Sequence, residues 1–146
     1  MPTATLTLTS ADIAGDPVSV SKTSTCYKAG TTEMLDETTG LQKTILATTT
    51  NKILLASTAG GNDGHAKVYI RNMSTTSTEY VTITINAQDI GKLYGGITGS
   101  TGGDWMFIPW NQTDTSAQIE IAASVATVMP IEYMLLHEGW DLTDAQ

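Results

Sequence analysis

Short stretches of this chain alternate strictly between apolar and polar residues, and this alternation limits what the chain can fold into. In the stretch TATLTLTS, Ala4, Leu6 and Leu8 fall on one side and threonines fall on the other. In YVTITINA, a valine and two isoleucines alternate with threonine and asparagine in the same way. A period of two places successive side chains on opposite faces of a β-strand, so both stretches predict strands with one apolar face.

The same pattern extends over most of the chain. Further apolar or alternating runs are VSVS, LQKTIL, KILLAST, AKVYIRNMS, WMFIPW, AQIEIAAS and IEYMLLHEG, and polar or glycine-rich turns separate them. About eight to ten short strands without a convincing helix predict an all-β fold, an antiparallel β-sandwich or jelly-roll-like barrel with an extended N-terminal arm. The polar turns predict that hairpins dominate. Pro109 predicts an edge position or a strand end for WMFIPW, whereas IEYMLLHEG is apolar enough to be central.

The length of 146 residues indicates a single domain, but the first fifty residues differ from the rest. Residues 1–50 hold 14 of the 26 threonines and alternate less regularly. We expect residues 1–50 to form either an extended arm that reaches a neighbouring subunit or two ordinary edge strands. We expect residues 51–146 to form the core of the sandwich.

Charge is scarce and unevenly distributed. The formal net charge is −8, and the last cation is Lys92, so residues 101–146 carry only acidic charges. This excess of acidic groups disfavours nucleic acid and anionic membranes as partners. The sequence begins without the basic and apolar segments of a signal peptide, and no apolar run is as long as a membrane helix. A threonine-rich surface with few charges suits a protein that packs against neighbours.

The stretch GGITGSTGGDW, residues 95–105, is the strongest candidate for a phosphate-binding loop. A P-loop needs a lysine that reaches the phosphate, and this stretch has none. A dinucleotide fingerprint needs a helix after its glycines, but WMFIPW is strand-like. We therefore expect this stretch to form an elongated hairpin tip and not a nucleotide site.

Other reactive side chains form no recognisable set. His65 and His137 lie far apart in the sequence, and the single cysteine, Cys26, is expected to be a small buried residue. Glu120 and Glu132 fall on the outward side of separate predicted strands, where exposed glutamates are ordinary. We therefore expect no catalytic residue, no metal site and no cofactor, and we do not expect an enzyme.

Exposed aromatic and large apolar residues are the better candidates for a functional surface. Trp105 and Trp110 are five residues apart, so on a regular strand they point to opposite faces and at least one points outward. An outward tryptophan serves as a ligand platform or a subunit contact, whereas an inward one anchors the strand by burial. The candidate contact surface consists of Tyr94, Ile97, Trp105, Trp110 and Trp140.

Residues 65–139, about half of the chain, carry a broader pattern. KVYIRNMS, YVTITI, IGKLYGG, GDWMFIPWN, IEIAAS and IEYMLLHEG follow one another in this order. This layout resembles that of small β-sandwich virion proteins of tailed bacteriophages. The resemblance implies that Gly103 is a turn glycine before a strand and that Pro109 closes this strand. The sequence departs from the pattern by inserting GITGSTG, which lengthens the intervening loop.

The resemblance implies a capsid decoration (cement) protein that bridges capsomers on the outer surface of a virion and is made in the host cytoplasm. Its expected partners are the major capsid protein and copies of itself, commonly as a homotrimer. Two other functions stay open at this point. One is a neck or tail adaptor of the same kind of particle, and the other is a carbohydrate-binding or adhesin module.

Overall fold

The computed structural model describes residues 2–13, 16–27, 35, 37–56, 65–97, 102–111 and 117–137. All regular secondary structure in these residues is β-structure. The strands are β1 (Thr3–Ile13), β2 (Asp16–Thr25), β3 (Glu37–Thr38), β4 (Gln42–Leu46), β5 (Lys52–Leu55), β6 (His65–Asn72), β7 (Tyr80–Ile85), β8 (Gln88–Tyr94), β9 (Trp105–Asn111), β10 (Ile119–Ala123) and β11 (Met129–His137).

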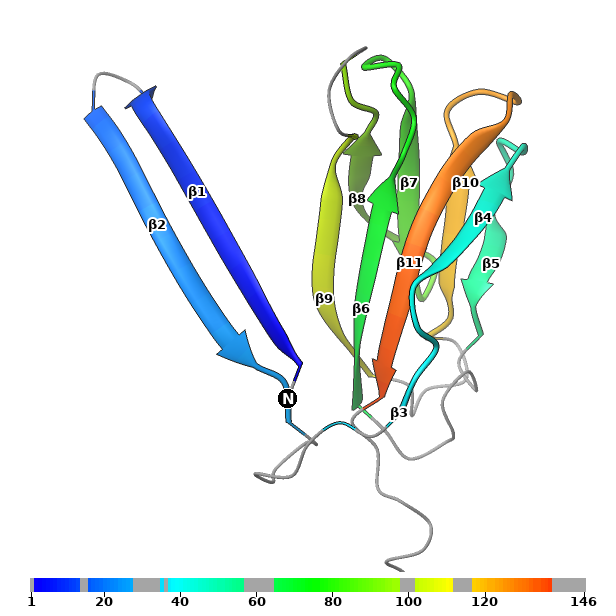
Figure 1. Cartoon of the computed structure of the whole chain (residues 1–146). Helices are drawn as coiled ribbons and strands as arrows, with labels where there is room; N and C mark the ends of the chain where they lie inside the picture. Colours follow the sequence, from blue (N-terminus) through cyan, green and yellow to red (C-terminus); the bar gives the residue numbers. More distant parts are fainter. Residues whose placement is uncertain are drawn as a thin grey trace, which may run out of the picture.

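The strands from β3 onward form two facing antiparallel sheets (Figure 1). One sheet has the order β5-β10-β7-β8, and the other has the order β3-β11-β6-β9 with β4 also paired to β11. The short β3 pairs with Leu136 and His137, whereas β4 pairs with residues 129–133 of the same strand. Together β3 and β4 therefore act as one interrupted edge strand along β11.

Chain connections between the two sheets follow a simple rule. β4 continues into β5, β6 into β7, β8 into β9 and β10 into β11, and the two members of each pair occupy corresponding places in the two sheets. This is the strand order of a double-sheet jelly roll. The predicted all-β antiparallel fold is therefore confirmed. The predicted dominance of hairpins is wrong for the sandwich: within the described residues, β7 and β8 are the one sequential pair of its strands that hydrogen-bond to each other.

The core lies between the two sheets and follows the predicted alternation. Val68 and Ile70 of β6 and Val81 and Ile83 of β7 are all completely buried. Their sequence neighbours Lys67, Tyr69 and Arg71 lie on the outer face of β6, as predicted. Ile85 is only half-buried because the register against β8 shifts after Ile83 and interrupts the alternation. The edge position of β9 and the central position of β11 are also confirmed.

β1 and β2 form a separate two-stranded antiparallel sheet, which we call the arm. The two arm strands pack mainly on each other, and the arm diverges from the sandwich toward its tip (Figure 1). This confirms the predicted extended N-terminal arm, but the arm is shorter than residues 1–50. Residues 37–46 belong to the sandwich, because β3 and β4 pair with β11 and Leu46 is buried in the core.

Candidate interaction surfaces

Three of the five residues predicted as a contact surface are exposed, and all three lie at or within the β8–β9 connection. Tyr94 ends β8, Trp105 begins β9, and Ile97 lies in the connection between these strands. Their exposed fractions are 44% for Tyr94, 49% for Trp105 and 71% for Ile97. Trp105 and Ile97 also line one shallow hollow beside the glycines. Trp140 lies outside the described residues.

Trp110 does not belong to this surface, and its prediction as a contact residue is wrong. Its side chain is only 4% exposed and belongs to the core. The indole Nε1–H donates a hydrogen bond to the carbonyl oxygen of Ala117 at 2.6 Å. Trp105 and Trp110 thus point to opposite faces of β9, as their five-residue spacing requires.

The glycine-rich stretch connects the two sheets and is not a hairpin, since β8 and β9 belong to different sheets. The prediction of an elongated hairpin tip is therefore wrong. Both described ends of the stretch are held by backbone hydrogen bonds. The N–H of Asp104 donates to the carbonyl oxygen of Tyr94 at 2.7 Å, and the N–H of Gly96 donates to that of Ser74 at 2.8 Å. Residues 98–101 lie outside the described residues.

Gly103 shows why glycine is needed in this connection. A Cβ atom at this position would overlap the backbone carbonyl oxygens of Tyr94 and Asn72. The N–H of Gly103 donates to that same Asn72 oxygen at 3.1 Å. The glycine therefore allows a close backbone approach that fixes the start of β9, which carries Trp105.

Asn72, which is not among the residues predicted from the sequence, organises the same region from within the molecule. Its side chain is completely buried. The amide Nδ2 donates to the carbonyl oxygen of Leu93 at 3.0 Å, and Oδ1 accepts from the N–H of Ser74 at 2.9 Å. The sequence did contain a signal for this role, because Asn72 follows Val68 and Ile70 on the inward side of the β6 alternation. A buried amide must find hydrogen-bond partners.

Trp105 belongs to a larger group of apolar side chains on the outer face of the sheet. The rings of Trp105 and Tyr69 are 6.4 Å apart between centroids. The strand register places Phe107 and Met134 directly on either side of Tyr69. We call Tyr69, Trp105, Phe107 and Met134 the aromatic patch. Only Trp105 of this patch is predicted from the sequence, because the other three residues join it through pairing between strands that are distant in sequence.

Polar interactions hold the Tyr69 ring in the patch. The hydroxyl of Tyr69 donates to Oε1 of Glu132 at 3.2 Å, and the ammonium of Lys43 lies 3.9 Å from the other carboxylate oxygen. Burial, together with the hydrogen bond and the negative charge of Glu132, raises the pKa of Tyr69 above its ordinary value, and Arg71 partly offsets this rise. These contacts thus fix the position of Tyr69 within the aromatic patch.

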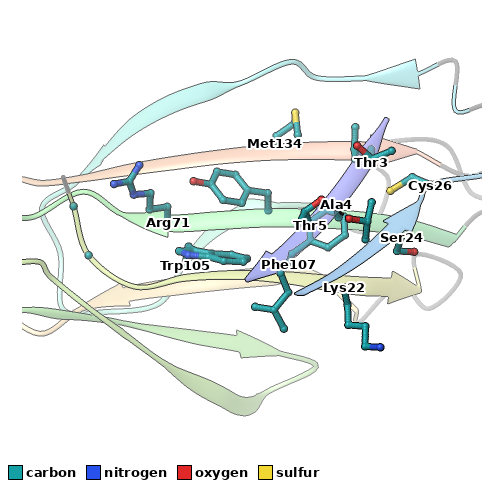
Figure 2. A pocket seen from close by; sticks show the side chains of 16 residues that line it. Thr3, Ala4, Thr5, Lys22, Ser24, Cys26, Arg71, Trp105, Phe107 and Met134 are labelled. Carbon is teal, nitrogen blue, oxygen red and sulfur yellow. Dashed lines mark hydrogen bonds between the residues drawn. The ribbon is translucent and has the colours of Figure 1, made fainter. Parts of the chain in front are cut away.

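A groove of about 970 Å³ separates the arm from the aromatic patch. Its walls are the patch on one side and residues 3–6 and 22–24 of the arm on the other. Figure 2 shows the arm strands crossing the sheet that carries Trp105, Phe107 and Met134. At the root of the arm, the N–H of Cys26 donates to the carbonyl oxygen of Pro2 at 2.9 Å. Cys26 is buried, as expected.

The two glutamates considered for acid–base chemistry lie on different sheets. The Glu120 carboxylate of β10 accepts hydrogen bonds from the amides of Asn51 and Gln118. Glu132 lies on the outer face of β11 and is 8% exposed, so the expectation that it is an exposed residue is wrong. Its burial follows from its contacts with Tyr69 and Lys43.

Across the described part of the chain, His, Cys, Asp and Glu side chains form no group of three that could hold a metal ion. The described residues also contain no helix long and apolar enough to cross a membrane. The described residues that line the groove include no histidine, and the side chain of His65 lies outside the described part of the structure.

No protein-family model matches the sequence, and no curated protein matches it significantly.

Proposed function

We propose that the protein is a structural component of a virus particle, most specifically a capsid decoration protein of a tailed bacteriophage. The observation that carries this proposal is the arm, which exposes an apolar face beside the aromatic patch. Surfaces of this kind mark protein–protein contacts. They suit adhesion between subunits better than chemistry on a small substrate.

The fold and composition add support from a different direction. The double-sheet jelly roll occurs in viral capsid proteins and in lectins, so it is compatible with the proposal without establishing it. The resemblance of residues 65–139 to small virion proteins favours a capsid decoration protein. The threonine- and serine-rich face of the arm over residues 3–10 and 18–25 carries no charge, so it can lie against a neighbouring subunit without bringing like charges together.

In the proposed mechanism, each copy lies on the outer surface of the capsid and contacts both the major capsid protein and neighbouring copies. Single contacts of this type are weak when they are small. Several contacts made by one homotrimer raise the avidity by about 10²–10⁴. The protein would thus stabilise the shell by linking adjacent capsomers.

The direct test mixes the purified protein with capsids assembled without it from the major capsid protein of the same genome. Co-sedimentation and a density map should show the protein bound at regular positions on the outer surface. Binding only to isolated necks or tails would instead favour the adaptor function. No binding to any particle component would overturn the proposal.

A carbohydrate-binding function is the second candidate, and Trp105 is the observation that favours it. Its half-exposed indole lies beside Tyr69 at the edge of the groove, as aromatic platforms for sugar rings do. Binding to a glycan array that is lost in a Trp105→Ala variant would support this function. Equal binding by the wild-type protein and the variant would reject it.

A further inference from the structure

The apolar face of the arm lacks a cover along part of its length. The strand register pairs Leu8 with Val20 and Leu6 with Lys22 on this face, while serines and threonines occupy the opposite face. Leu6 and Leu8 are each 50% exposed, and Val20 is 37% exposed. In an isolated monomer, these large aliphatic side chains of the protruding arm would be exposed to water.

The edges of the arm also lack the usual protection over most of their length. Within the described residues, β1 and β2 pair only with each other, so each has an unpaired edge. Over residues 3–10 and 18–25 the one charged residue is Lys22, and there is no proline. The charged residues and the proline in the strand ends near the tip are Asp12, Asp16 and Pro17. Soluble proteins normally blunt such edges with charges, prolines or covering segments. An isolated two-stranded sheet is also marginally stable in water. These features are typical of a segment that is covered in an assembly.

The groove separates the arm into two halves. The arm residues that line it stop at Leu6 on β1 and begin at Lys22 on β2. Leu8 and Val20 lie beyond this lining, in the distal half of the arm. The sandwich of the same chain thus lies opposite the half of the arm near its root. In the part of the chain that the structure describes, the distal half has no apolar surface of its own chain to pack on.

We infer that the distal half of the arm packs on the aromatic patch of a second copy of this chain, so that neighbouring copies exchange arms. The inference rests on the proposed assembly role and names a second copy of this chain as the partner of the arm. The chain carries both complementary surfaces, the Leu8–Val20 pair and the aromatic patch, and each is partly open.

Charge also favours a second copy over an unrelated partner. Each chain has a net charge of −8, which opposes close approach of two copies. The distal half of the arm carries Asp12 and Asp16, whereas Lys67 and Arg71 lie on the outer face of β6 beside the aromatic patch. The contact therefore places acidic and basic segments close together and locally offsets this repulsion. Lys22 stays in the groove of its own chain.

The first experiment measures the mass of the full chain by sedimentation velocity over a wide range of concentrations. The wild-type protein should sediment as two or more chains. A Leu8→Lys variant should weaken association by at least about tenfold, because a lysine is costly to bury in an apolar contact. The matched control is Thr7→Lys, which places the same residue on the hydroxyl face of the same strand and should associate like the wild type.

A second pair of variants tests the receiving surface. Trp105→Lys should weaken association, whereas Ile53→Lys should not, although both wild-type side chains are 49% exposed. At concentrations low enough to keep all proteins monomeric, thermal unfolding of every variant should match that of the wild type, which shows that the sandwich is intact. A wild-type protein that stays monomeric at all concentrations would overturn the inference. Equal effects within either pair of variants would overturn it too.

The outcome is separable from that of the proposed function. If the protein binds capsids but its copies never associate through the arm, arm exchange is wrong and the decoration function stands. If copies associate through the arm but no capsid component binds them, the decoration function is wrong and arm exchange stands.

Discussion

The arm and the sandwich are both built from antiparallel strands of alternating residues, yet the two regions treat their apolar side chains in opposite ways. Ile83 of the sandwich is completely buried, whereas Leu8 of the arm is half-exposed. The difference lies in the second layer, since the sandwich has two facing sheets and the arm has one. Alternation therefore predicts a strand with an apolar face, but only the surrounding layers decide whether this face is buried within the chain.

The largest effect should come from cutting back a side chain in the core. Ile83→Ala should lower the free energy of unfolding by about 2–5 kcal/mol, because it removes buried methyl groups and leaves a cavity. Leu8→Ala should change it by less than about 0.5 kcal/mol, since Leu8 supports no second layer of its own chain. Urea unfolding of dilute protein measures both values. A loss of similar size in both variants would show that the arm belongs to the core after all.

The next effect tests the connection that fixes the start of β9. Gly103→Ala should destabilise the protein by about 1–3 kcal/mol, because the added Cβ would overlap two backbone oxygens. Gly91→Ala is the matched control, since a Cβ at that position of β8 meets nothing within 4 Å. The control should be neutral or slightly stabilising. If Gly103→Ala unfolds like Gly91→Ala in urea, the close approach is not important for the sandwich.

A smaller effect is expected where the sandwich faces the arm. Tyr69→Phe should cost about 1 kcal/mol at neutral pH, through loss of the hydrogen bond to Glu132. Because the folded state raises the pKa of Tyr69, its phenolic proton contributes stability that is complete below the unfolded pKa. This contribution disappears as the pH rises through the folded pKa.

The ultraviolet absorbance of tyrosinate checks this prediction. One tyrosine of the wild-type protein should ionise at a higher pH than it does in the unfolded chain, and this step should be missing in Tyr69→Phe. Urea unfolding should also show a weaker alkaline loss of stability in the variant. Identical alkaline titrations of the two proteins would contradict the environment assigned to Tyr69.

The smallest effect should be a gain in stability at the hairpin of the sandwich. The two residues between β7 and β8 both have positive φ, 51° at Asn86 and 57° at Ala87. This conformation costs an alanine about 1–2 kcal/mol and costs glycine little. Ala87→Gly should therefore raise the midpoint of thermal unfolding by a few degrees, with a gain of up to about 1 kcal/mol. A lower midpoint would show that the turn is not strained.

The strands of the sandwich also show how much of the fold can be predicted from the sequence. The period of two correctly predicts the inward residues of β6, and Pro109 correctly predicts the edge position of β9. β8 escaped prediction because the turn before it is Asn86-Ala87 and lacks the Asn-Gly signature of a two-residue hairpin. The sequence also did not predict that the glycine-rich stretch connects the two sheets. A polar turn has the same kind of composition whether it joins neighbouring strands of one sheet or strands of different sheets.

The candidate surfaces were predicted only in part, for a related reason. Tyr94, Ile97 and Trp105 are exposed as expected, because they are large apolar residues next to turns. Trp110 lies on the inner face of the same strand, and the sequence alone did not indicate which of the two tryptophans points inward. The aromatic patch depends on pairing between β6, β9 and β11, which are distant in sequence.

The most direct test of the account asks whether the arm of one copy reaches the sheet of another. A Leu8→Cys variant labelled with ¹⁵N is mixed with an unlabelled Phe107→Cys variant under mild oxidation, and mass spectrometry identifies the labels in each disulfide-linked dimer. Thr7→Cys in place of Leu8→Cys is the matched control, and the wild-type protein controls for the buried Cys26. Arm exchange predicts mixed dimers between the Leu8→Cys and Phe107→Cys variants well above the Thr7→Cys control. A yield no higher than that control would contradict it.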